Sequence, residues 1–139
     1  MKNAILKSIT LALVVLISTS LFSSLKAQSK TSSPKIYAVI NRADWCPTCQ
    51  ANGSRVMSEV LPACSKLSVQ FVANDLTNEK SISKSTVELK KFSVFNSVKE
   101  TNKTGVILLI DAKTKKVVKE ISVSLPSTEI IKQIKESQI

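Results

Sequence analysis

The sequence predicts a three-layer α/β sandwich with elements in the order β-α-β-α-β-β-α around a mixed central sheet. Short apolar runs of strand type alternate with segments of helical periodicity, which is typical of a sheet with parallel neighbours. The last two strand-like runs are separated only by a polar turn, which predicts an antiparallel hairpin. Of the 139 residues, 43% are hydrophobic and 22% are charged, a globular balance that argues against wholesale disorder.

The first predicted strand is Ile36–Ile40, a short apolar run typical of a buried strand. From Pro47 to about Lys66, apolar residues recur at spacings of three and four, which predicts one buried face of a helix. The residues of this face are Val56, Met57, Val60, Leu61, Cys64 and Leu67. Pro62 falls inside the pattern, where a proline kinks a helix or ends it early.

A second strand is predicted from Val69 onward, and it should end near Asp75. Further along, Ser85–Glu88 has the spacing of a capping box, with the serine as N-cap and the glutamate at the third helical position. This box predicts the start of a second helix. The inner stripe of that helix would carry Leu89, Phe92, Phe95 and Val98. Such a stripe indicates core packing rather than a ligand site.

Val106–Ile110 is the most strand-like run in the chain, and a polar turn separates it from the fourth predicted strand, Val117–Val123. Lys119 fits an edge position in that strand, because charge discourages pairing with other chains. Pro126 then opens the last helix, whose inner face carries an isoleucine set. This set is Ile130, Ile131 and Ile134. We expect a right-handed, parallel first βαβ unit and helices on both faces of the sheet.

The N-terminal residues 1–27 have the pattern of a secretory signal peptide. Lys2 and Lys7 precede an apolar run at 9–17 that is short for a membrane span, and Ala27 fits the cleavage position. An uncleaved N-terminal anchor is the alternative. We expect the mature protein to lie in a bacterial periplasm or to be secreted, after cleavage near Ala27, in a compartment where disulfides persist.

Cleavage there would leave 112 residues, with a flexible lead-in at 28–34 and one folded domain at 35–139. It would also lower the formal net charge from +10 to +7, because three lysines lie in the signal segment. The remaining lysines are scattered and no aromatic residues are interleaved with them. We interpret the basic excess as a solvated surface and expect no nucleic-acid partner.

The absence of histidine excludes Ser-His-Asp and Cys-His nucleophiles and histidine-ligated zinc. Attention therefore falls on Cys46 and Cys49, which follow the first strand and open the first long helix. Pro47 suits the first helical position, so Cys46 should lie at or near the N-cap. The free amides of the first turn and the helix dipole favour a thiolate there, which should lower the pKa of Cys46 below the roughly 8.5 of a free cysteine.

Thiolate is the attacking species in thiol–disulfide exchange. Cys49 lies one helical turn further on, where it can reach the sulfur of Cys46. We therefore predict Cys46 as an exposed nucleophile and Cys49 as the resolving thiol. Cys64, on the apolar face, is predicted to be a small buried hydrophobe, with a reactive thiol or an intermolecular bridge as the alternative.

Two other uses of the Cys46–Cys49 pair stay open. One is a plain stabilising disulfide, although so short a loop constrains the unfolded chain little. The other is a dithiolate site for zinc or copper(I), and copper(I) could be held by the pair alone or with Met57. Zinc usually takes four ligands, and the chain has neither a second CxxC nor a histidine.

The string Ala43–Cys49, Ala-Asp-Trp-Cys-Pro-Thr-Cys, resembles the active-site motif of the thioredoxin superfamily, whose members carry WCxxC at this strand–helix junction. The predicted element order resembles the thioredoxin fold over essentially all mature residues. The resemblance implies an exported thiol–disulfide oxidoreductase, with reduction as the favoured direction and no organic cofactor. It implies cysteine-containing protein substrates and a membrane electron donor or acceptor. Trp45 would flank the nucleophile and help form the substrate platform.

Two positions depart from the family pattern. Gly105, after Thr104, stands where the family has a cis-proline that helps dock the substrate, so Thr104 and Gly105 are the expected substrate contacts. Ile40 takes the place of a buried acid that assists proton transfer, so Asp44 or water would have to serve. The first departure favours the metal-binding alternative. Together they raise a third hypothesis, an interaction domain with little turnover.

Overall fold

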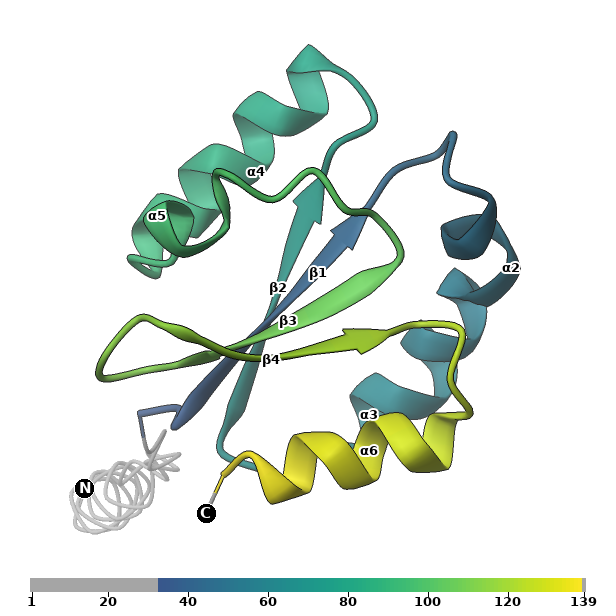
Figure 1. Ribbon diagram of the computed structural model, residues 1–139, viewed down its shortest axis with the longest axis vertical. Coiled ribbons are helices and arrows are strands. Elements are labelled where there is room, and N and C mark those ends of the chain that lie inside the picture. The colour runs from purple at the N-terminus through teal and green to yellow at the C-terminus, as the bar shows by residue number, and fades with distance from the viewer. Residues whose placement is uncertain (1–32, 139) are drawn as a thin grey trace, which may run out of the picture. The chain divides into compact units, whose positions relative to one another are not determined.

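A four-stranded mixed sheet forms the middle layer of the structure, a computed structural model that describes residues 33–138 (Figure 1). The strands lie in the order β2-β1-β3-β4. β1 (Ile36–Arg42) pairs in parallel with β2 (Val69–Asp75) and antiparallel with β3 (Val106–Asp111). β4 (Val117–Ser122) pairs antiparallel with β3. The predicted hairpin, the parallel first pair and the edge position of Lys119 are therefore confirmed.

The predicted signal segment and the lead-in up to residue 32 lie outside the described residues. The described part of the chain falls within one compact unit. Within residues 33–138, no helix combines the length and the apolar character that a membrane-spanning helix requires.

The helix after β1 changes its winding in front of a proline. It runs as α2 (Pro47–Arg55), a π-helical turn η2 (Val56–Val60) and α3 (Leu61–Ala63). In the π turn, the Leu61 amide donates to the Val56 carbonyl five residues back. Because Pro62 has no amide hydrogen and its ring crowds the carbonyl four residues before it, a widened turn at this point accommodates the ring.

The π turn also decides which residues face the sheet. Val56, Val60 and Cys64, spaced by four, are buried as predicted. Met57, which we expected on the same face, is 60% exposed, so that part of the prediction is wrong. The physical reason is the five-residue hydrogen bonding of the turn, which aligns residues four or five apart instead of three and four.

The helix that follows β2 begins earlier than predicted. α4 (Glu79–Lys91) starts after Asn78, whose side chain accepts a hydrogen bond from the Ser81 amide at 3.0 Å. Ser85 is therefore not an N-cap. It lies buried in the middle of α4, where its hydroxyl accepts from the Asp75 amide at 2.9 Å. The Ser85 side chain, which the sequence spacing predicted as a helix cap, thus binds the backbone of β2 instead.

The predicted stripe on this helix is also split between two helices. α4 ends at Lys91, and Ser93 has a φ of 57°, which breaks the helical path. The chain then forms a short separate helix, α5 (Phe95–Val98). Leu89 and Val98 nevertheless pack in one core, so the interpretation of the stripe as core packing is confirmed.

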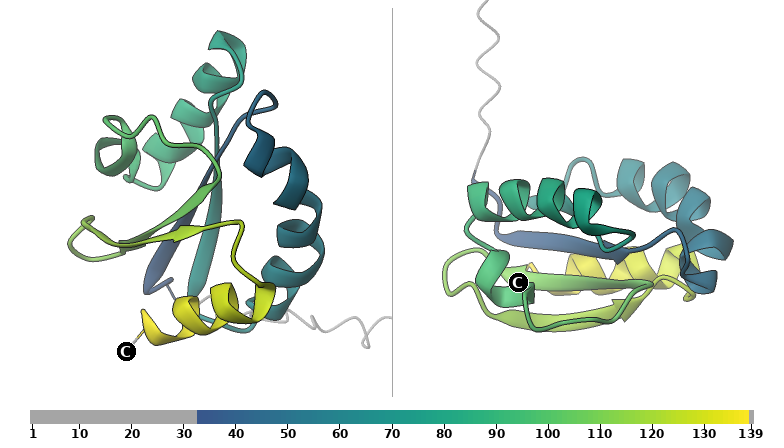
Figure 2. Two further views of the ribbon diagram at one scale, coloured as in Figure 1. Left: turned by 45° about the vertical axis from the view of Figure 1, so that its right-hand side comes forward. Right: turned by 90° about the horizontal axis from the view of Figure 1, so that it is seen from above.

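Helices cover both faces of the sheet, which confirms the three-layer prediction. The left-hand view of Figure 2 shows α4 and α5 on one side of the strands, and α2 and α6 (Ser127–Glu136) on the other. Side chains of β3 alternate between the two cores. Ile107 and Leu109 join the core under α6, and Leu108 and Ile110 join the core under α4 and α5. The continuous apolar run of this strand follows from burial on both faces.

Candidate functional site

The junction between β1 and α2 places Cys46 at the start of a helix. Cys46 is the N-cap residue of α2, with an extended backbone at φ −85° and ψ 113°. Its Sγ accepts a hydrogen bond from the Cys49 amide at 3.2 Å, and Pro47 occupies the first helical turn. Pro47 lacks an amide hydrogen that would have no helical partner there. The predicted placement of the sulfur against the amino-terminal end of the helix is confirmed.

The loop that carries Cys46 is tied to the segment after β2. The Thr77 hydroxyl accepts from the Asp44 amide at 3.0 Å, and the Thr77 carbonyl accepts from Trp45 Nε1 at 3.3 Å. The Trp45 side chain remains 60% exposed. The residue directly before Cys46 thus carries an indole ring that is held by a hydrogen bond and remains accessible to solvent.

The sulfur of Cys46 is not exposed, and this part of the prediction is wrong. Only 3% of Cys46 is accessible to solvent. Gly105, at φ +75°, lies so close that a Cβ added there would come 3.6 Å from Cys46 Sγ and 3.0 Å from Thr48 Cγ2. Cys46 is thus buried, and the Gly105 backbone lies close to both Cys46 Sγ and the Thr48 side chain.

The pKa values of the two thiols are shifted in opposite directions. Burial raises the pKa of Cys46, but hydrogen bonds from the side chains of Cys49 and Thr104 and from backbone amides outweigh it, so the pKa falls below its usual value. Burial raises the pKa of Cys49, and its hydrogen bond to Cys46 raises it further. The pair is therefore polarised, and Cys46 loses its proton more readily than Cys49.

Two buried asparagines position the segment that carries Thr104. Asn41 and Asn74 are register partners at the ends of β1 and β2. Asn74 Nδ2 donates to Asn41 Oδ1 at 2.9 Å, and Asn41 Nδ2 donates to the Lys103 carbonyl at 3.1 Å. Our sequence reasoning missed both residues. The available signal was a pair of amides at the ends of two otherwise apolar strands, since buried polar groups need partners.

Replacing Thr104 with valine should shift the pH dependence of Cys46 alkylation upward. Valine keeps the shape of threonine but removes a hydroxyl that favours the thiolate, so the pKa of Cys46 rises and its reaction with iodoacetamide at neutral pH slows several-fold. The rate should be measured against pH. Thr104→Ser, which restores the hydroxyl, should return the profile toward that of the wild type. An unchanged profile in Thr104→Val would show that the hydroxyl does not act on Cys46.

The third cysteine is separate from the pair. Cys64 is 1% exposed, and burial raises its pKa, so the prediction of a buried hydrophobe is confirmed. All three cysteines are free thiols in this structure. Among residues 33–138, no group of three or more His, Cys, Asp or Glu side chains is arranged to hold a metal ion.

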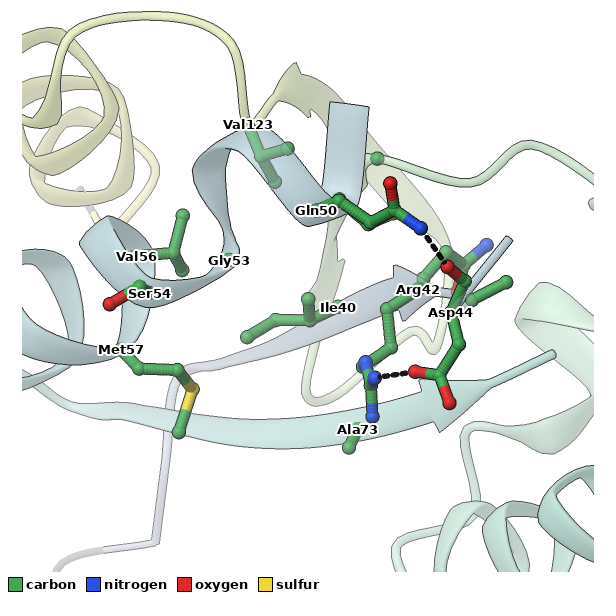
Figure 3. A pocket seen from close by; sticks show the side chains of 14 residues that line it. Ile40, Arg42, Asp44, Gln50, Gly53, Ser54, Val56, Met57, Ala73 and Val123 are labelled. Atoms are coloured by element: carbon green, nitrogen blue, oxygen red, sulfur yellow. Dashed lines mark hydrogen bonds and ion pairs between the residues drawn. The ribbon is translucent and has the colours of Figure 1, made fainter. Parts of the chain in front are cut away.

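A cavity of about 650 Å³, which we call the Cys49 cavity, opens beside the pair between α2 and the sheet (Figure 3). Ile40 and Ala73 line it from β1 and β2, and Met57 lines it from η2. The place of the family's buried acid is thus an apolar wall. Asp44, the alternative proton carrier, is paired with Arg42 at one end of the cavity. Sequence reasoning missed the cavity, because only the fold brings these small and apolar residues together.

No known protein-family profile matches the sequence, and a search of curated proteins finds no match either. Among solved structures, the chain is similar to the crystal structure of Trxlp from Edwardsiella tarda EIB202. The two share 13% identity with a TM-score of 0.47, over 74% of this chain and 84% of that one. The strand order, the element order and the position of the CxxC pair make residues 33–138 a thioredoxin-like α/β sandwich.

Proposed function

We propose that this chain is a thiol–disulfide oxidoreductase that exchanges the Cys46–Cys49 dithiol or disulfide with cysteines of protein substrates. The observation that carries the proposal is the Cys46 sulfur at the N-cap of α2, where it accepts from the Cys49 amide. Such a sulfur is stabilised as the thiolate, which is the nucleophile of disulfide exchange. The second thiol lies one helical turn away, within reach of the first.

In the reducing direction, the Cys46 thiolate attacks one sulfur of a substrate disulfide. A bond forms between Cys46 and that sulfur, and the other substrate sulfur leaves as a thiolate. Cys49 then loses its proton and attacks Cys46 Sγ. This attack expels the substrate sulfur that was bonded to Cys46, as a thiolate, and closes the Cys46–Cys49 disulfide. The substrate gains two electrons and the protein pair loses two.

The low pKa of Cys46 and the high pKa of Cys49 suit this sequence of steps. In the reduced protein, Cys49 holds its proton partly because the Cys46 charge and hydrogen bond raise its pKa. Once Cys46 is bonded to substrate, that charge is gone, so Cys49 becomes easier to ionise at the moment when it must attack.

The substrate contacts belong to the same proposal. Trp45 offers an exposed ring on the residue next to Cys46, and Thr104 and Gly105, which directly precede β3, lie close to Cys46. Because Cys46 is only 3% exposed, a protein substrate has to displace neighbouring groups to reach the sulfur. We further propose export to the periplasm or exterior, on the basis of the N-terminal sequence pattern. The resemblance to exported thioredoxin-like proteins favours reduction as the physiological direction, with a membrane electron donor or acceptor as partner.

Replacing Cys49 with serine should trap the protein on its substrates. Without the resolving thiol, the Cys46–substrate disulfide persists, and adducts of higher mass should appear on non-reducing gels and vanish with dithiothreitol. The tagged variant should be expressed with its own leader in a bacterial host and captured after acid quenching.

The matched control for this trap is the double variant Cys46→Ser/Cys49→Ser, which keeps Cys64 and should form no adducts. Adducts that persist in the double variant would assign the reactivity to Cys64. A folded Cys49→Ser variant that captures nothing would contradict the exchange function and favour an interaction domain with little turnover.

A further inference from the structure

The two ends of the sheet carry different parts of the molecule. At one end, the strand register brings together Ile36 of β1, Val69 of β2 and Asp111 of β3. Cys46 lies at the other end, where β1 leads into α2. Figure 1 shows the start of β1, the β3–β4 turn and the end of α6 on the side away from the start of α2. Since β1 has seven residues, roughly 20 Å of strand separates this end from the cysteine pair.

Hydrogen bonds join the ends of two helices to the end of the sheet that lies away from Cys46. Lys35 Nζ donates to the Gln138 carbonyl after α6 at 3.1 Å. Lys115 Nζ, from the β3–β4 turn, donates to the Phe92 carbonyl after α4 at 3.2 Å. The last turns of α4 and α6 therefore lie beside the start of β1 and the β3–β4 turn.

Lysines are concentrated in the segments that meet at this end, which we call the lysine end. It carries eight lysines, all exposed except the half-buried Lys115, and three acidic residues. The lysines are Lys35, Lys66, Lys90, Lys91, Lys113, Lys115, Lys116 and Lys135, and the acids are Glu88, Asp111 and Glu136. The other described residues include eight basic and seven acidic side chains, so they are almost neutral. Lysines that are scattered in the sequence are thus brought to one end by the fold.

Aromatic rings lie among these lysines. Lys115 Nζ is 4.3 Å from the centroid of the Tyr37 ring, and Lys90 Nζ is 5.3 Å from the centroid of the Phe95 ring. The Phe92 and Tyr37 rings lie 5.7 Å apart. All three rings are half-buried. Long cationic side chains over partly exposed rings form an amphipathic surface, which is favoured at membrane interfaces.

The use of lysine rather than arginine favours a lipid surface over an acidic protein. Among the described residues the two arginines, Arg42 and Arg55, lie away from the lysine end, and they donate to Asp75 and Ser127. Arginine recognises single carboxylates through paired hydrogen bonds of fixed geometry, whereas lysine acts as a point charge. Lysines spread over five segments suit the diffuse negative charge of an anionic lipid surface.

The course of the chain also favours a membrane. The described part of the chain begins at Ser33, just before β1, and so at the lysine end. The sequence before Ser33 contains the apolar run at 9–17, which predicts a signal peptide or, as the alternative, a membrane anchor. That segment is therefore joined to the domain at the lysine end.

We propose that the lysine end binds the surface of anionic phospholipid membranes, and that the cysteine pair then faces away from the membrane. The inference goes beyond the proposed function and does not rest on it. Charges more than about 10 Å from the lipid are largely screened at about 0.1 M salt, so the cysteine end adds little to the attraction. In this orientation the pair is open to soluble proteins, and a membrane-embedded electron donor has to reach it with a domain that extends from the lipid.

The first test is sedimentation of the full-length protein with lipid vesicles. It should bind vesicles of phosphatidylcholine that contain one-quarter phosphatidylglycerol, and it should bind pure phosphatidylcholine vesicles much more weakly. Binding to the anionic vesicles should fall as salt is added, because counter-ions screen the attraction. Equal binding to both kinds of vesicle, or binding that salt does not weaken, would overturn the proposal.

Charge reversal at the lysine end provides the decisive variant. Lys113→Glu/Lys116→Glu should weaken binding about thirtyfold, because each lysine near an anionic surface adds about 1 kcal/mol. The matched control is Lys80→Glu/Lys84→Glu, the same change of charge in the first half of α4, roughly 10 Å or more along the helix from its last turn. This control should bind almost as the wild type does, and so should Lys113→Arg/Lys116→Arg. Equal losses in the two glutamate variants would overturn the proposal, because total charge would then decide binding.

Trp45 reports the orientation on the vesicle. It is the single tryptophan of the sequence, lies at the cysteine end and is 60% exposed. In the vesicle-bound protein its fluorescence should stay as sensitive to acrylamide as in the free protein, and brominated lipids should not quench it. Shielding from acrylamide, or quenching by brominated lipid, would place the cysteine end against the membrane and overturn the proposal.

Vesicle binding and disulfide exchange can fail independently. Binding uses no cysteine of the pair, so Cys46→Ser/Cys49→Ser should bind the anionic vesicles as the wild type does. If the wild type binds no vesicles while Cys49→Ser still traps proteins, the membrane proposal is wrong and the exchange function stands. An acidic protein then replaces lipid as the partner to seek for the lysine end. If vesicles bind but Cys49→Ser traps nothing, the exchange function is wrong and the membrane surface stands.

Discussion

Cys46→Ser should reduce the disulfide-exchange activity of this protein to the level of buffer. The serine hydroxyl can still accept the N-cap hydrogen bond from the Cys49 amide, because serine is itself a preferred N-cap residue. It cannot form a mixed disulfide, however, so the first covalent step is lost. The measurement is insulin reduction in the presence of dithiothreitol, followed as turbidity, for the wild type and the variant at equal concentration.

The preserved cap makes this a test of chemistry rather than of folding. Thermal unfolding of Cys46→Ser should stay close to that of the wild type. Cys64→Ser is the matched control, because it removes the same sulfur atom from a buried position away from the pair and should keep the insulin activity. Activity that survives in Cys46→Ser but disappears in Cys64→Ser would transfer the nucleophile to Cys64 and contradict the assignment of the site.

Leu109→Ala should destabilise the protein by about 2–5 kcal/mol, the range for leucine truncations in close-packed cores. Leu109 lies on the inner strand β3, is fully buried, and packs in the same core as Val60 and Ile130. Alanine leaves a cavity between the sheet and the helices on this face, which rigid neighbours can close only in part. Urea unfolding monitored by circular dichroism gives the free energy of unfolding.

Val118→Ala is the control for this core substitution. Val118 lies on the edge strand β4 and is 54% exposed, so its truncation should change the free energy of unfolding by about 0.5 kcal/mol or less. If Leu109→Ala proves as mild as Val118→Ala, β3 is not the centre of a packed core. The arrangement of the sheet as the middle layer would then have to be revised.

Local patterns were sufficient for most of the fold. Each strand was predicted from a run of apolar residues within its own segment, and the pairing of β3 with β4 followed from the short turn between them. Prediction failed where a local signal had a distant partner. Ser85 resembled a helix cap in sequence, but in the fold its hydroxyl binds the Asp75 amide.

The same division applies to the candidate site. The sequence by itself determined that Cys46 caps a helix, because Pro47 and the strand before it are its immediate neighbours and helix ends are local structures. Only the tertiary structure decided that Gly105, which lies far along the chain, comes close to that sulfur, and that Gly53 and Ala73 line a cavity beside Cys49. Solvent access and empty space depend on which surfaces meet after folding, whereas the capping of a helix depends on consecutive residues.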